Sequence, residues 1–113
     1  MKLVNLNTGE TLASDLHTAK TFLERLRGLM FSKELPQGTG LHIRPCRSIH
    51  TFFMRYAIDV LYLDENHTIV GMQEKLPPGR VGPLVPRAVS VVELPAGSLS
   101  LTQTKDGQAV VFL

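Results

Sequence analysis

Four polar side chains stand within or beside apolar patterns, and their types could do chemistry: Arg25, His50, Asp59 and Glu93. In one interpretation they line a cleft in which His50 acts as a base or a ligand, Asp59 orients it and Arg25 holds an anion. In the other they form a satisfied buried network. Arg25 is then paired with Asp59 or Glu93, and His50 is hydrogen-bonded to the backbone. The residues alone leave both interpretations open.

Asp59 makes the strongest demand on the fold. Both faces of the stretch 58–64 are largely apolar, which is typical of a central strand covered on both sides. Asp59 starts a row whose next two members are Leu61 and Leu63. An unpaired buried carboxylate is costly or loses its charge. We therefore expect a cation or an imidazole to lie beside Asp59.

The stretch before Asp59 supplies a further candidate. On a strand, His50, Phe52 and Met54 would face the same way, which places Met54 beside the expected cleft. The predicted ligand-binding set is Arg25, His50, Met54, Asp59 and Glu93, and the catalytic candidates are His50 and Asp59. The chain has no HxH or HExxH spacing, so we predict no metal site and no cofactor.

Bulk properties indicate one globular domain over residues 1–113. Of these residues, 43% are apolar and 19% are charged, which suffices for a core. The net charge is +2, and basic and acidic residues are interleaved along the chain. A basic stripe is the expected footprint of nucleic-acid binding, so none is predicted.

Cysteine usage and hydropathy limit the redox chemistry and the location. Cys46 is the only cysteine, so an intrachain disulfide is excluded. We favour a passive, half-buried thiol over a nucleophile whose pKa is lowered by Arg47. No apolar run reaches the length of a membrane span. The prediction is a cytoplasmic protein, or a periplasmic or secreted one if a leader was trimmed; a small-molecule or protein partner and the oligomeric state stay open.

The first third of the chain predicts a hairpin and then a helix. Strands at 2–6 and 11–15 would flank a turn at Gly9. A helix is expected near residues 18–31, with Thr21 and Glu24 as its capping box. Its apolar residues share one face, which predicts a core contact: Phe22, Leu23, Leu26, Leu29 and Met30. Gly28 in such a helix suggests that another backbone passes close by.

The remaining chain alternates strands and turns. Further strands are expected at 41–44, 68–73, 88–94 and 109–113, whereas 76–86 is an irregular loop and 98–102 is a strand or a helical turn. The predicted fold is mainly β, a compact antiparallel barrel or sandwich-like domain with one amphipathic helix.

Several runs in this order resemble a known family, the domain of unknown function 192. They are residues 25–31 (RLRGLMF), 49–54 (IHTFFM), 58–60 (IDV) and 93–97 (ELPAG). The resemblance implies a compact β-barrel or sandwich-like domain with one helix. The family has no established biochemical function, so the resemblance implies no reaction.

Three functions stay open on the sequence. The first is a module that binds a small ligand or a protein partner in a cleft near His50 and Asp59. The second is a hydrolase or a metal-assisted enzyme that uses these two residues. The third is a structural domain, which would expose a large apolar patch.

Overall fold

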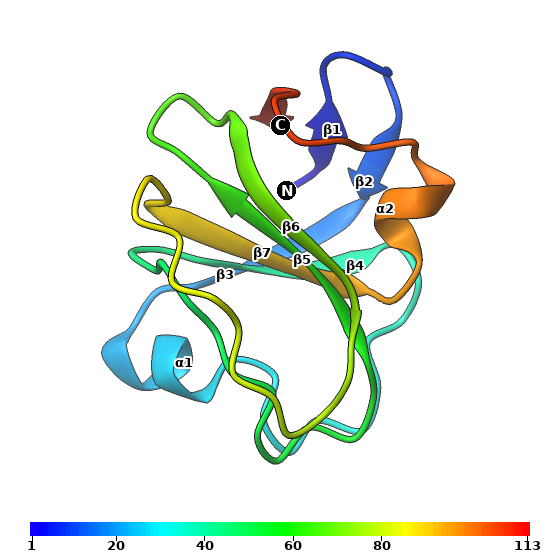
Figure 1. Ribbon diagram of the computed structural model, residues 1–113. Helices are drawn as coiled ribbons and strands as arrows, with labels where there is room; N and C mark the ends of the chain where they lie inside the picture. The colour runs from blue at the N-terminus through cyan, green and yellow to red at the C-terminus, as the bar shows by residue number, and fades with distance from the viewer.

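The computed structural model describes residues 1–113 and contains two β-sheets (Figure 1). The larger sheet has the order β3 (Asp15–Ala19), β4 (Thr39–Ile43), β7 (Ser90–Pro95), β5 (Ile58–Leu63) and β6 (Ile69–Leu76). The smaller has the order β2 (Thr11–Ala13), β1 (Leu3–Asn5) and β8 (Val110–Phe112). All neighbours are antiparallel except β3 and β4, which are parallel.

The predicted mainly β class is confirmed, and the arrangement is sandwich-like. The barrel alternative is not supported, because the strands form two separate sheets and the larger one does not close on itself. The first hairpin is confirmed as β1 and β2. The helical alternative at 98–102 is confirmed as α2 (Ser98–Leu101), which follows β7, so the fold has two helices instead of the single one predicted. The β3 strand was also missed, because its residues were assigned to the hairpin end and the helix start.

The core consists of two apolar clusters on opposite faces of the larger sheet. Leu61, Leu63 and Leu94 belong to the cluster that the smaller sheet and α2 cover. Val60 and Val91 belong to the other cluster, which packs against the loops before β5 and before β7. All residues of β5 are buried, and β5 pairs with β6 and β7. The prediction of a central strand covered on both sides is confirmed.

Helix α1 (Phe22–Arg27) is shorter than predicted and lies at one end of the molecule (Figure 1). Its capping box is present: the Glu24 amide donates to Thr21 Oγ1, and the Thr21 amide donates to Glu24 Oε1. The helix ends at Gly28, whose φ of 52° and ψ of −124° favour a residue without Cβ. No residue of α1 is buried, so the predicted core face is wrong for Phe22, Leu23 and Leu26, whereas Leu29 beyond the helix packs against the cluster of Val60. The spacing is helical, but spacing alone does not show whether another element covers the apolar face.

Residues 50–55 form turns, so the strand predicted there is also wrong. His50 makes only an isolated bridge with Val81, and Phe53 has a φ of 62°. The Thr51 hydroxyl donates to the Pro77 carbonyl at 2.6 Å and accepts from the Arg80 amide at 2.8 Å. These bonds hold the loop before β5 beside the irregular loop predicted at 76–86.

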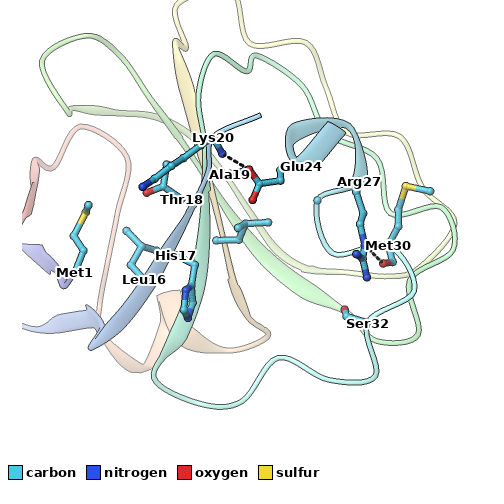
Figure 2. A pocket seen from close by; sticks show the side chains of 12 residues that line it. Met1, Leu16, His17, Thr18, Ala19, Lys20, Glu24, Arg27, Met30 and Ser32 are labelled. Carbon is cyan, nitrogen blue, oxygen red and sulfur yellow. Dashed lines mark hydrogen bonds between the residues drawn. The ribbon is translucent and has the colours of Figure 1, made fainter. Parts of the chain in front are cut away.

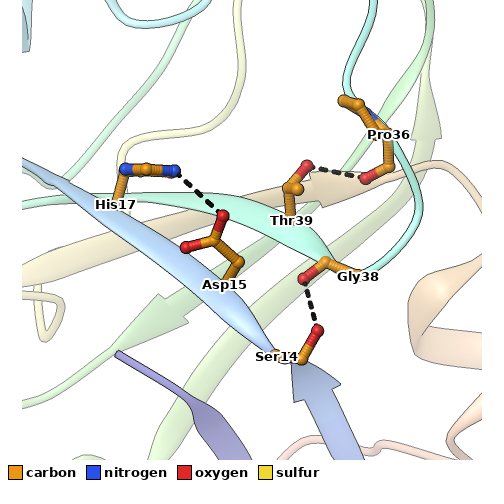
Figure 3. A network of polar contacts seen from close by, with 6 residues as sticks. All are labelled: Ser14, Asp15, His17, Pro36, Gly38 and Thr39. Atoms are coloured by element: carbon orange, nitrogen blue, oxygen red, sulfur yellow. Dashed lines mark hydrogen bonds and ion pairs between the residues drawn. The ribbon is translucent and has the colours of Figure 1, made fainter.

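Several polar contacts lie where the parallel strands β3 and β4 begin (Figure 3). Ser14 Oγ donates to the Gly38 carbonyl at 3.3 Å, and Thr39 Oγ1 donates to the Pro36 carbonyl at 2.6 Å. His17 lies 3.3 Å from the Asp15 carboxylate, with both side chains exposed. Surface pairs of this kind contribute little to stability, so the backbone pairing fixes the strands. Neither helix is long and apolar enough to cross a membrane.

Candidate functional site

The larger sheet separates the polar residues that the sequence grouped together. Side chains alternate along a strand, and residues paired across two strands share a face. Glu93 pairs with Val60 and therefore faces the cluster of Val60 and Val91. Asp59 alternates with Val60 and faces the cluster of Leu61. Asp59 and Glu93 thus lie on adjacent strands but on opposite faces, and they cannot share one network.

Asp59 is buried and is satisfied by backbone amides. Its Oδ1 accepts from the Lys75 amide at 2.8 Å and its Oδ2 from the Leu99 amide at 2.9 Å. No cation or imidazole lies beside it, so the expected partner was wrong. Lys75 has a φ of 52° where the β5–β6 pairing is irregular, and Leu99 lies in the first turn of α2. The carboxylate therefore fixes a bulge and a helix start.

Arg25, His50 and Glu93 do come together around a cavity of about 180 Å³. Helix α1 and its C-terminal turn form one wall, and the end of β4 and residues 46–50 form the other. Four apolar side chains contribute to the lining: Leu26, Leu29, Ile43 and Ile49. The site is a small, mixed cavity, partly apolar and partly cationic, over one buried carboxyl group.

Glu93 is the most perturbed group at this cavity. Its side chain is 2% exposed, and Oε1 has no hydrogen-bond partner. Burial raises the pKa of Glu93 from 4.5 to about 7. Near neutral pH the group is therefore divided between a carboxylic acid, which donates a hydrogen bond, and a carboxylate, which only accepts. Unpaired buried oxygens are uncommon in folded proteins, so this one needs an explanation.

Gly28 gives the carboxyl group its space. A Cβ at this position would lie 3.4 Å from Glu93 Oε1 and 3.8 Å from Ile43 Cδ1. The sequence suggested that another backbone passes Gly28, but the neighbour is this carboxyl side chain. The glycine serves both the positive φ at the end of α1 and the close approach of Glu93.

The arginines at the cavity form no ion pair with a carboxylate. Arg25 Nη1 donates to the Lys20 carbonyl at 3.1 Å, and Arg27 Nε is 3.5 Å from the Met30 carbonyl. The predicted pairing of Arg25 with Asp59 or Glu93 is therefore not found. Each guanidinium has five N–H groups, so donors remain for a ligand.

His50 is held by its neighbours in the chain. Its Nδ1 accepts from the Phe52 amide at 3.2 Å, as the predicted backbone bond required, and its ring stacks on Phe52 at 5.2 Å. The neutral imidazole then carries its proton on Nε2. Asp59 does not orient His50, because it lies on the far face of the sheet.

Cys46 lines the cavity, whereas Met54 does not. The half-buried Cys46 thiol donates to the Ser48 carbonyl at 3.0 Å, and burial raises its pKa. Arg47 does not activate it, which agrees with a passive thiol. Met54 is buried in the core cluster of Val60. No three side chains among His, Cys, Asp and Glu are grouped so that they could hold a metal ion.

A larger depression of about 640 Å³ shares Arg27 and Gly28 with this cavity (Figure 2). His17, Lys20 and Glu24 contribute to its lining, and all three are exposed. Glu24 is already engaged as the capping residue of α1. We place the candidate site in the smaller cavity, because only there does a buried carboxyl oxygen lack a partner.

Sequence reasoning missed Gly28 and Cys46 as cavity residues. Gly28 did carry a signal, since a glycine in an expected helix interior is unfavourable. Cys46 carried none, because its place at the cavity follows from the turn after β4.

Fold and site together define a sandwich-like β domain with a small cavity over a buried, titratable carboxyl group. The chain belongs to the DUF192 family, described as "Uncharacterized ACR, COG1430", whose sequence profile matches residues 4–112. The resemblance predicted from the sequence is confirmed.

Two relatives and one solved structure illustrate the match. The UPF0127 protein PH1112 of Pyrococcus horikoshii is 34% identical over 100 residues, covering 84% of each chain. A UPF0127 protein of Thermococcus sibiricus is 30% identical over 118 residues, covering 96% of this chain and 72% of the relative. A crystal structure of a protein of unknown function from Novosphingobium aromaticivorans has a TM-score of 0.84 at 18% identity, covering 98% and 82%. This last likeness shows the fold alone.

Proposed function

We propose that this protein is a non-catalytic module that binds a ligand in the cavity over Glu93. The observation that carries the proposal is Glu93, whose buried Oε1 has no partner and which lines the cavity together with Arg25 and His50. Leaving a buried polar atom unpaired costs about 1–3 kcal/mol. A ligand that supplies the missing hydrogen bond recovers this cost on binding.

The lining favours a ligand with an acidic group and a short apolar part. Protonated Glu93 donates a hydrogen bond to a ligand carboxylate, and the free guanidinium donors of Arg25 and Arg27 add charge-assisted contacts. Leu26, Leu29 and Ile43 would pack against the apolar part. The acidic group belongs to a small molecule or to a protein partner.

The alternative is a hydrolase or a metal-assisted enzyme that uses His50 and Asp59. It loses support because Asp59 is fully buried and both its oxygens accept backbone hydrogen bonds. His50 lies at the cavity on the other face of the sheet, so these two residues do not form a catalytic pair.

The test is a titration with butyrate and with butylammonium, followed by amide chemical shifts of Gly28, Cys46 and Glu93. Butyrate needs protonated Glu93, so its affinity should fall about tenfold between about pH 6 and 8, given the pKa of about 7. A site that prefers a cation would instead bind butylammonium, with an affinity that rises over the same pH range. Shifts from neither probe would remove the proposal.

Two variants sharpen this test. Glu93→Gln keeps a hydrogen-bond donor and should bind butyrate with no dependence on pH in this range. Glu93→Leu removes the donor and should abolish binding. The matched control is Glu65→Gln in the exposed turn after β5, which should behave as the wild type.

A further inference from the structure

Large apolar side chains are exposed around the mouth of the cavity. Phe22, Leu23 and Leu26 of α1 are 70%, 73% and 59% exposed, and Phe53 is 66% exposed. On a helix, residues three and four apart share a face, so the first three lie together. Soluble monomers seldom gather such residues unless the surface binds something.

Contacts join these side chains into one surface. Leu26 and His50 line the same cavity, and the His50 ring stacks on Phe52. The ring of the next residue, Phe53, stacks on the Phe31 ring with 5.3 Å between the ring centres, and the Phe53 carbonyl accepts a hydrogen bond from the Phe31 amide. We call this set, Phe22, Leu23, Leu26, Phe31, Phe52 and Phe53, the apolar rim.

The backbone of the apolar rim is unfavourable for its residues. Phe31 and Phe53 both have positive φ, 65° and 62°, a region that bulky side chains rarely adopt. Such residues persist mainly at functional sites. The two rings are presented outward, which indicates a selected surface and not a packing defect.

The segments that carry the apolar rim or are bonded to it are rich in basic residues. The segments 20–55 and 80–87 hold nine of the 12 lysines and arginines but only two of the ten acidic residues, Glu24 and Glu34. The first segment contains the whole apolar rim, and the second is bonded to it through Thr51 and Arg80.

We infer that the apolar rim docks on an anionic lipid bilayer. Aromatic and aliphatic side chains surrounded by arginines match the boundary between acyl chains and anionic headgroups. Charge complementarity selects this occupant over a second copy of the chain, whose equivalent surface would carry the same positive charge.

The experiment is sedimentation of the intact chain with vesicles of phosphatidylcholine alone and of phosphatidylcholine mixed with phosphatidylglycerol. The chain should sediment with the anionic vesicles, and this binding should fall at least about tenfold at high salt. The variant Leu23→Gln with Phe53→Asn should lose binding at least about tenfold. Gln is a good helix former and Asn tolerates positive φ, so the variant should fold.

The matched control is Leu101→Gln in α2, a residue 77% exposed at the opposite side of the fold (Figure 1). It should bind as the wild type does. Four results would overturn the inference: absence of binding to anionic vesicles, equal binding to both vesicle types, lipid-free self-association lost in the double variant, or preferential binding to an oligonucleotide. None of these depends on the Glu93 cavity, so this inference and the proposed function fail separately.

Discussion

Replacing Glu93 by Gln isolates the cost of charging the buried carboxyl group. Burial raises the pKa of Glu93 from 4.5 to about 7 in the folded protein, and water keeps it near the ordinary value in the unfolded chain. Between these two values the unfolded chain has lost the proton while the folded protein keeps it, so stability falls as pH rises. Below about pH 4.5 both states are protonated, and this loss is absent.

The magnitude follows from the difference between the two pKa values, about 2.5, at about 1.4 kcal/mol for each unit. Charging Glu93 therefore costs up to about 3 kcal/mol above pH 7. Gln has the same size and stays neutral. The free energy of unfolding of Glu93→Gln should equal that of the wild type near pH 4.5 and exceed it by about 3 kcal/mol near pH 8.

Urea unfolding of both proteins across this pH range measures the difference directly. Glu65→Gln in the exposed turn is the control and should show no change with pH beyond that of the wild type. A difference between Glu93→Gln and the wild type that is the same at every pH would refute the reasoning. So would a variant that is less stable than the wild type at high pH.

Three further substitutions test the fold around the site. Asp59→Asn replaces one accepting oxygen by a donor that faces a backbone N–H, so urea unfolding should show a loss of about 2–4 kcal/mol; a loss under about 0.5 kcal/mol would contradict this. Gly28→Ala should cost about 1–3 kcal/mol of stability because of the φ and ψ at this position, and it should also change the amide chemical shifts of the cavity residues. The control Gly107→Ala also has a positive φ but open space around its Cβ, so it should affect stability alone. Burial lowers the pKa of His42 from 6.5 to about 4, so stability is lost as pH falls between these values, by up to about 3 kcal/mol; His42→Phe should remove that slope, and an unchanged slope would exclude His42 as its source.

The sequence was most informative where local patterns decide the structure. The two apolar faces of residues 58–63 predicted a covered central strand, and that strand is β5. The Thr21–Glu24 pair predicted a helix start, which is confirmed. Both features depend on side chains close together in the chain, and a single sequence displays them directly.

Long-range geometry could not be predicted, because it depends on contacts between residues far apart in the chain. Helical spacing shows that Phe22 and Leu26 share a face but does not show whether another element covers it. The strand register decides that Asp59 and Glu93 face opposite sides, and nothing in either strand encodes the pairing of Glu93 with Val60. The four polar residues that the sequence grouped are therefore separated. Asp59 is a structural carboxylate on one face of the sheet. Arg25, His50 and Glu93 line the cavity on the other face.

The most direct test of the Glu93 cavity is the carboxyl carbon resonance of Glu93, followed by NMR against pH with and without butyrate. The titration midpoint should lie near 7 without ligand. It should rise further with butyrate, since the ligand stabilises the protonated form. A midpoint near the ordinary 4.5, or one that butyrate leaves unchanged, would contradict a buried acid that receives a ligand.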